Sequence, residues 1–196
     1  GGYTKRANSA NALGRQEMRA ESINAWTPAR DFREVMAEAE RFYAANGQPT
    51  IFRLTPLAGE EADPILAAAG YEALDRCSVM TAPLDAAQPD ARVRLELGPT
   101  PAWLNGIAAA QGVAPSHRLI HDRIVQAIAL PTAFATAYLG DKAAGFGLAV
   151  LDRGAVGLFD IVVRPELRGA GLGRAITRSL MDFGRAEGAG TAYLQV

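Results

Sequence analysis

The segment 168–173 joins a positive charge to a glycine-rich loop, in the order Arg-Gly-Ala-Gly-Leu-Gly. It follows the apolar run 156–163 and precedes a stretch in which Leu172, Ile176 and Leu180 recur at helical spacing. The N-terminus of a helix leaves four backbone N–H groups without an intrahelical partner and carries partial positive charge. Glycines remove the side chains that would keep an anion away, and they permit positive φ. The segment therefore predicts a phosphate-binding loop that starts a helix.

The spacing of the glycines excludes two common nucleotide-binding loops. A dinucleotide fingerprint requires Gly-x-Gly-x-x-Gly, and counting from Gly169 places Arg174 at the last glycine. Counting from Gly171 places Ile176 there, so both registers fail. A P-loop requires a Gly-Lys pair, and the segment contains no lysine. The pattern that remains is Arg-x-x-Gly-x-Gly, beginning at Arg168.

This pattern, after an apolar strand, resembles the coenzyme A loop of the GNAT superfamily of N-acetyltransferases. The preceding residues 162–167 (Val-Val-Arg-Pro-Glu-Leu) resemble the entry of that family into its loop, and the resemblance extends over residues 92–196. It implies an N-acetyltransferase that moves an acetyl group from acetyl-CoA to an amine, by direct attack in a ternary complex. The amine would be a small molecule or a peptide. The alternative is a non-catalytic acyl-CoA-binding sensor or regulatory module.

The resemblance also implies how acetyl-CoA is bound. The pantetheine arm would pair with the exposed backbone of a strand, and the pyrophosphate would lie on the glycine-rich loop. A backbone N–H near Val163 would stabilise the developing oxyanion. The implied cofactor-binding residues are Ile161, Val162, Val163, Arg164, Arg168, Gly169, Ala170, Gly171, Leu172, Gly173 and Arg174.

Asp160 is the candidate for the catalytic base, because it is the only carboxylate in the run 156–163. Some members of the family carry Glu at the position of Gly157, which cannot serve. A buried carboxylate costs several kcal/mol unless it is hydrogen-bonded. Asp160 is therefore either a base or water-orienting group, or a carboxylate that is bonded to the backbone or positions the substrate. The family's usual general acid, a Tyr on the helix after the final strand, would lie beyond Val196.

Two histidines, His117 and His121, are four residues apart on a predicted helix. Imidazoles at that spacing can share a metal ion, but no third ligand accompanies them. We therefore expect no metal site, and we expect both side chains on a solvated face.

The residues around the loop predict an α/β fold with a mixed twisted sheet. The sheet should be mostly antiparallel, with one parallel βαβ unit, and should be flanked by helices. Tight turns separate three apolar runs, which predicts an antiparallel meander. The predicted elements are strands at 92–97, 133–139, 144–151, 156–163 and 191–196, and helices at 101–111, from Ser116 to about Leu130, and from Leu172 to Gly188.

The chain is expected to contain two related units joined by a linker at 82–90. The first half predicts a helix and then a strand within 35–55, a helix at 63–69 and a strand at 76–82. An offset of 141 residues relates the halves by matching Phe42 to Phe183, Ala45 to Ala186, Gly47 to Gly188, and Thr50 to Thr191. The expected domains are a degenerate GNAT-like unit at 1–85 without a coenzyme A loop, and a catalytic acetyl-CoA-binding domain at 90–196. By this repeat, the second unit would lack its last helix and strands.

The composition limits the partners. A net charge of −1 and a pI near 6.2 argue against a nucleic-acid binder. No window approaches the roughly 18 apolar residues of a membrane span. A single cysteine, Cys77, excludes an internal disulfide and favours the cytoplasm. A homodimer is compatible with these expectations.

Overall fold

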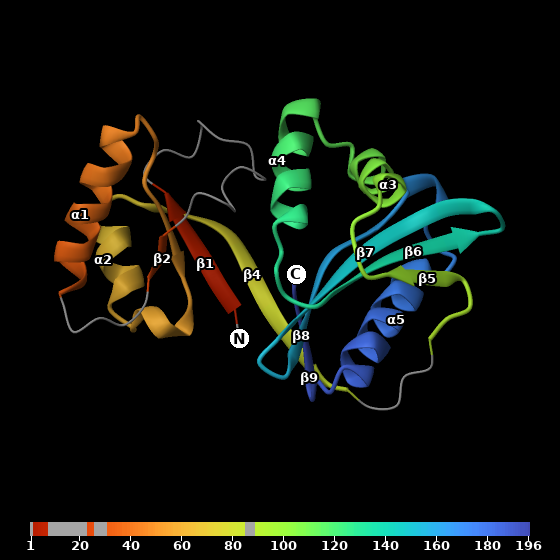
Figure 1. Cartoon of the computed structure of the whole chain (residues 1–196). Helices are drawn as coiled ribbons and strands as arrows, with labels where there is room; N and C mark the ends of the chain where they lie inside the picture. Colours follow the sequence, from red (N-terminus) through yellow and green to blue (C-terminus); the bar gives the residue numbers. More distant parts are fainter. Residues whose placement is uncertain (1, 8–22, 26–30, 85–88) are drawn as a thin grey trace. The chain divides into compact units, whose positions relative to one another are not determined.

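The computed structural model describes residues 2–7, 23–25, 31–84 and 89–196. The chain divides into two compact units (Figure 1). Unit 1 comprises residues 1–80 with 195–196, and unit 2 comprises residues 81–194. No helix among the described residues is long and apolar enough to cross a membrane. The centre of the predicted linker, 85–88, lies outside the described residues.

Unit 1 contains a small mixed sheet and two helices. β1 pairs antiparallel with β3 and β4, whereas β2 runs parallel to β3. The sequence did not predict β1 or β2, and it placed the start of β4 too late. The elements are β1 (Gly2–Ala7), β2 (Ile23–Ala25), α1 (Phe32–Ala45), β3 (Ile51–Leu54), a 3-10 turn at Pro56–Ala58, α2 (Ala62–Ala68) and β4 (Glu72–Pro83).

An aromatic cluster forms the core of unit 1. Phe52 on β3 is fully buried, and its ring lies 5.8 Å from that of Phe32 and 5.6 Å from that of Tyr71. α1 begins where it does because the carboxylate of Asp31 accepts a hydrogen bond from the backbone N–H of Arg33 at 2.9 Å. The helix therefore satisfies part of its own N-terminus.

Unit 2 contains the predicted meander. Its strands lie in the order β9-β8-β7-β6-β5, and neighbours are antiparallel except for the parallel pair β8 and β9. This confirms the α/β fold with a mixed, mostly antiparallel sheet, and β2 and β3 of unit 1 add a second parallel pair. The strands are β5 (Val93–Glu96), β6 (Thr132–Leu139), β7 (Lys142–Asp152), β8 (Ala155–Val163) and β9 (Thr191–Gln195).

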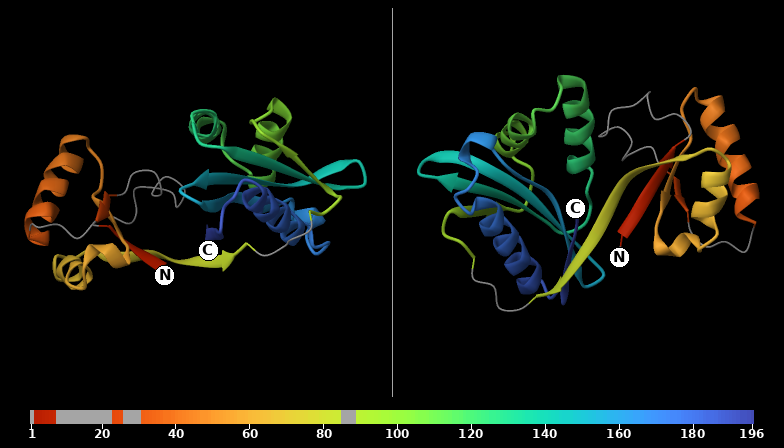
Figure 2. Two further views of the ribbon diagram at one scale, coloured as in Figure 1. Left: turned by 60° about the horizontal axis from the view of Figure 1, so that its bottom comes forward. Right: turned by 180° about the vertical axis from the view of Figure 1, so that it is seen from behind.

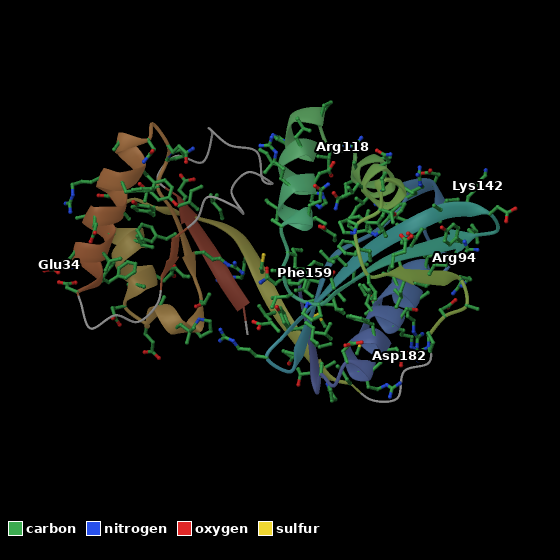
Figure 3. The ribbon with its side chains drawn as sticks, viewed as in Figure 1. Glu34, Arg94, Arg118, Lys142, Phe159 and Asp182 are labelled. Carbon is green, nitrogen blue, oxygen red and sulfur yellow. The ribbon has the colours of Figure 1, made fainter. Side chains whose placement is uncertain are left out.

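Helices cover both faces of the unit 2 sheet (Figure 2). α3 (Pro101–Gln111) and α4 (Pro115–Gln126) lie on one face, and α5 (Leu172–Ala186) lies on the other. Figure 3 labels Arg118 on α4 and Asp182 on α5, and these two helices lie on opposite faces of the sheet.

The predicted limits of α4 were wrong at both ends. The helix begins at Pro115 after Ala114, and Gln126 is its last residue. Pro131 disfavours a helical conformation at Leu130, and its carbonyl already accepts a hydrogen bond from the N–H of Leu151 at 2.9 Å. The residues between must lead the chain from the helix into β6.

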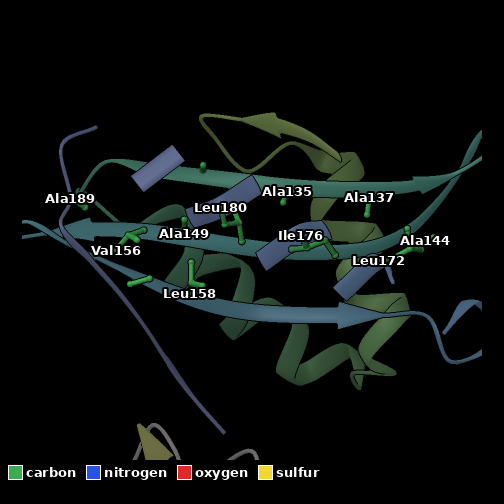
Figure 4. Packing of buried hydrophobic residues seen from close by; sticks show 12 residues of the cluster. Ala135, Ala137, Ala144, Ala149, Val156, Leu158, Leu172, Ile176, Leu180 and Ala189 are labelled. Carbon is green, nitrogen blue, oxygen red and sulfur yellow. The ribbon is translucent and has the colours of Figure 1, made fainter. Parts of the chain in front are cut away.

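The two faces of the sheet differ in side-chain size. The face toward α5 carries small residues such as Ala135 and Ala149, so the helix approaches closely (Figure 4). A Cβ atom on Gly147 would lie 2.6 Å from Cγ2 of Ile176, which shows how little space remains. The opposite face packs Trp103 edge-on against Phe134, with ring centroids 4.9 Å apart.

Candidate functional site

A bulge interrupts β8 at the predicted catalytic residue. Val162 pairs with Phe146 and Phe159 pairs with Leu148, so β8 has one more residue than β7 in this interval. Asp160 lies in the bulge with φ of 54°, a left-handed conformation that few non-glycine residues adopt. This conformation costs roughly 1–2 kcal/mol, and strain of this kind concentrates at functional sites.

The bulge coincides with the point where β8 and β9 separate. Among the described residues of unit 2, their parallel pairing runs from Ala155 with Thr191 to Leu158 with Leu194 and ends there. Residues 161–163 continue to belong to β8 and still face β7. The backbone of 161–163 on the β9 side is therefore a strand edge that an extended ligand can pair with.

The loop after β8 supplies an open helix start. Gly169 has φ of 86° and Gly171 has φ of 73°, so the backbone conformation favours glycine at both positions. Gly171 is the N-cap of α5 and makes no side-chain capping bond, and the first turn of α5 contains no acidic residue. The N–H groups of that turn therefore remain available to a ligand, in the partial positive charge of the helix end.

A cavity of about 570 Å³ connects the strand edge to the helix start. Arg168 also bridges the two, because its Nε donates to the carbonyl of Val163 at 3.2 Å. The residues that line the cavity are Ile161, Val162, Val163, Arg168, Gly169, Gly171, Leu172 and Gly173.

Three residues implied by the resemblance do not line this cavity. Arg164 turns toward β7, where its Nε donates to the carbonyl of Ala143 at 3.0 Å. The carbonyl of Ala170 accepts from Nη1 of Arg92 at 3.0 Å, which holds the loop from the side of β5. Arg174 is exposed on the first turn of α5.

The carboxylate of Asp160 is paired with His121 of α4. Oδ2 of Asp160 lies 2.8 Å from Nε2 of His121, and each side chain is 26% exposed. The ring of His121 stacks on Trp103, at an interplanar angle of 16°. The expectation that His121 lies on a solvated face was therefore wrong. The hydrogen bond to Asp160 raises the pKa of His121, and the opposing effect of burial is smaller.

The sequence contains one signal for this pair. A carboxylate within an apolar strand needs a donor, and the predicted helices contain several besides arginine, among them Asn105, His117 and His121. His121 meets that need, although its spacing from His117 pointed only to a metal ion. The described residues contain no group of three potential ligands that could hold such an ion.

Comparisons with known proteins identify the family of the chain. The family described as "Probable histone acetyltransferase Rv0428c C-terminal" matches residues 1–196. An "Uncharacterized N-acetyltransferase YobR" of Bacillus subtilis is 28% identical over 205 residues, which cover all of this chain and 76% of that protein.

Two solved structures show the same fold. A GCN5-related N-acetyltransferase from Kribbella flavida is 13% identical, with a TM-score of 0.65, and the match covers 90% of this chain and 68% of that one. A second, from Sphaerobacter thermophilus, is 18% identical with a TM-score of 0.52, over 71% of this chain and 48% of that one. The chain belongs to the Rv0428c C-terminal acetyltransferase family and is a GNAT-type N-acetyltransferase, an enzyme class that uses acetyl-CoA as its co-substrate.

Proposed function

We propose that this enzyme transfers the acetyl group of acetyl-CoA to an amine by direct attack, at the cavity between β8 and α5. One observation carries the proposal: the cavity joins an unpaired strand edge to an uncapped helix start. A ligand with an amide-bearing arm and a pyrophosphate needs both features in this order.

The residues fit the two parts of acetyl-CoA. Backbone groups of 161–163 would pair with the amides of the pantetheine arm, as an added strand does. The first-turn N–H groups of α5 and the guanidinium of Arg168 would bind the pyrophosphate. Arg174, exposed beside the helix start, would add charge without a fixed contact.

The reaction then requires two further functions. Asp160 would take the proton of the acceptor ammonium or orient the water that does so, because it lies directly before the strand edge. A backbone N–H near Val163 would stabilise the oxyanion as the amine attacks the thioester carbonyl. Holding the amine and the thioester together supplies much of the rate.

Replacement of Arg168 tests the binding mode. Arg168→Ala should raise the Kd for acetyl-CoA about 10-fold, since a charge-assisted hydrogen bond contributes roughly 1.5–3 kcal/mol. Isothermal titration calorimetry at two salt concentrations measures the loss, which should shrink at high salt. Arg178→Ala is the control, because Arg178 is exposed on α5 and does not line the cavity. Equal losses in the two variants would contradict the assigned site.

Release of free coenzyme A, followed with a thiol reagent, tests the transfer. The panel of acceptors should contain small amines and lysine-containing peptides. Because the family description names histones, a histone-tail peptide belongs among them. Tight binding of acetyl-CoA with no thiol release for any amine would contradict the proposal and favour an acyl-CoA-binding sensor.

We also propose that unit 1 is a degenerate GNAT-like unit that supports the fold and binds no coenzyme A. The order and parallel pairing of β2, α1 and β3 support this, since β8, α5 and β9 repeat them. The 141-residue offset also matches Ala45, the last residue of α1, to Ala186, the last residue of α5.

A further inference from the structure

We infer that His121 is the base that receives the proton of the acceptor ammonium, and that Asp160 positions its ring. This inference rests on the proposed acetyl transfer. Within that reaction it assigns the proton to His121 instead of Asp160. It is drawn from contacts that join α4 to the bulge of β8, two elements that lie far apart in the sequence.

The contact with Asp160 fixes the tautomer of His121. An unprotonated Nε2 and a carboxylate oxygen 2.8 Å apart would repel each other, so a proton lies between them. Nε2 therefore donates to Asp160, and Nδ1 of the neutral ring carries the free lone pair. The side chain is 26% exposed, and Nδ1 would take a proton from the acceptor directly or across one water molecule.

A second carboxylate stabilises the protonated ring. Oδ1 of Asp122 is buried, lacks a hydrogen-bond partner among the described residues and lies 3.7 Å from Nδ1 of His121. While His121 is neutral, two acceptors face each other across this distance. A proton on Nδ1 converts the pair into a donor and an acceptor, so the imidazolium would have a carboxylate at each nitrogen.

The other groups around His121 do not take the proton in its place. Arg118, one turn earlier on α4, binds Oδ2 of Asp122 at 3.5 Å and also the side-chain oxygen of Asn105 on α3. Trp103 of α3 contributes a ring nearly parallel to the imidazole, with ring centroids 6.5 Å apart. On β8 the partner is Asp160 itself, and the following residue, Ile161, lines the cavity.

The proton balance follows from these positions. His121 removes one proton from the ammonium, and the amine nitrogen then forms its bond to the thioester carbonyl carbon. The C–S bond breaks, and the coenzyme A sulfur leaves with the second proton of the attacking nitrogen. The imidazolium returns its proton to solvent, so one proton is released for each amide formed.

The inference predicts the direction in which kcat/KM changes with pH. Activity requires neutral His121, so kcat/KM should rise with pH through the pKa of His121, above the 6.5 of an ordinary histidine. The hydrogen bond to Asp160 is the main cause of that elevation. The acceptor amine of a lysine titrates near 10, well above this limb.

Two substitutions separate the roles. His121→Gln keeps a donor for Asp160 but cannot take a proton, so kcat/KM should fall about 100-fold and the rising limb should disappear. Asp160→Asn keeps the base but should move the limb toward lower pH. His117→Gln is the matched control, with the same change one turn away on α4, and it should leave rate and profile unchanged. A His121→Gln enzyme that retains the wild-type limb would overturn the inference.

A measurement without turnover separates this inference from the proposed function. The chain contains only two histidines, so ¹³C labelling of their rings gives two NMR titrations, which His117→Gln assigns. The pKa of His121 should be raised in the wild type and should decrease in Asp160→Asn. If acetyl-CoA binds but no amine is acetylated, the proposed function fails while this titration still stands. If the pKa of His121 is not raised in an active enzyme, that part of the inference in which Asp160 positions the ring would be refuted.

Discussion

The two βαβ segments of this protein have the same order and pairing but opposite helix starts. In unit 1, Asp31 caps α1 through the N–H of Arg33, and Glu34 adds a second negative charge in the first turn. In unit 2, α5 begins at Gly171 with no side-chain cap and no acid in its first turn. One helix start is capped by a side chain, and the other has no side-chain cap, which is where we propose that the pyrophosphate binds. A single scaffold can therefore hold or lack a phosphate site according to the residue that precedes the helix.

The helices also differ in how closely they pack. The 141-residue offset matches Gly184 of α5 to Tyr43 of α1, and both positions are buried. A Cβ on Gly184 would lie 2.5 Å from Cγ1 of Val156, so α5 lies almost against β8. α1 instead places the ring of Tyr43 at this position. At the other end of α5, a Cβ atom on Gly173 would lie 3.9 Å from Cγ2 of Val163, so the N-terminus of the helix lies beside the strand edge.

The largest expected effect comes from giving α5 the negative start of α1. Gly171→Asp places a carboxylate among the N–H groups that we propose bind the pyrophosphate. Repulsion at about 5 Å, with an effective dielectric constant near 20, is worth ~3 kcal/mol. The Kd for acetyl-CoA should rise about 100-fold in calorimetry.

Gly171→Asn provides the control for shape. It adds a side chain of the same size and the same strain at positive φ, but no charge. It should lose much less affinity than Gly171→Asp. If both variants lose the same affinity, the charge of the helix start does not explain the difference between the two units.

An intermediate effect is expected from the packing of α5. Gly184→Ala should lower the free energy of unfolding by about 1–3 kcal/mol, because the added methyl group overlaps Val156. Urea denaturation followed by circular dichroism measures this. Gly190→Ala is the control, since a Cβ atom on Gly190 would meet no atom of the described residues within 4 Å and φ is not positive there. A Gly184→Ala protein as stable as the wild type would show that α5 has room to move.

The smallest effect is expected in unit 1. Asp31→Ala removes the cap of α1 and should cost about 1 kcal/mol of stability, whereas Asp31→Asn should retain most of it. The affinity for acetyl-CoA should not change in either variant. A change in that affinity would contradict a purely structural role for unit 1.

The sequence predicted what is local. The glycine spacing, the stripe of Leu172, Ile176 and Leu180, and the tight turns each depend on neighbouring residues, and the structure reproduces the elements they define. The bulge at Asp160 was not predicted, because no local pattern requires an aspartate to adopt positive φ. The pairing of Asp160 with His121 spans 39 residues and two elements, so only the packed unit reveals it.

The bulge of β8 also limits how this strand can vary in length. Side chains of a regular strand alternate between faces, so Leu158 would share its face with position 162 rather than 161. The extra residue reverses this: Leu158, Ile161 and Val163 all pack with the α5 side, and Val162 packs with the Trp103 side. Removal of Asp160 would leave a regular alternation in which Leu158, Ile161 and Val163 still share a face. Removal of a residue outside the bulge would instead exchange the faces of the residues that follow it. The strand can therefore lose a residue at the bulge and keep its core face, but it cannot lose one elsewhere without turning Ile161 and Val163 away from α5.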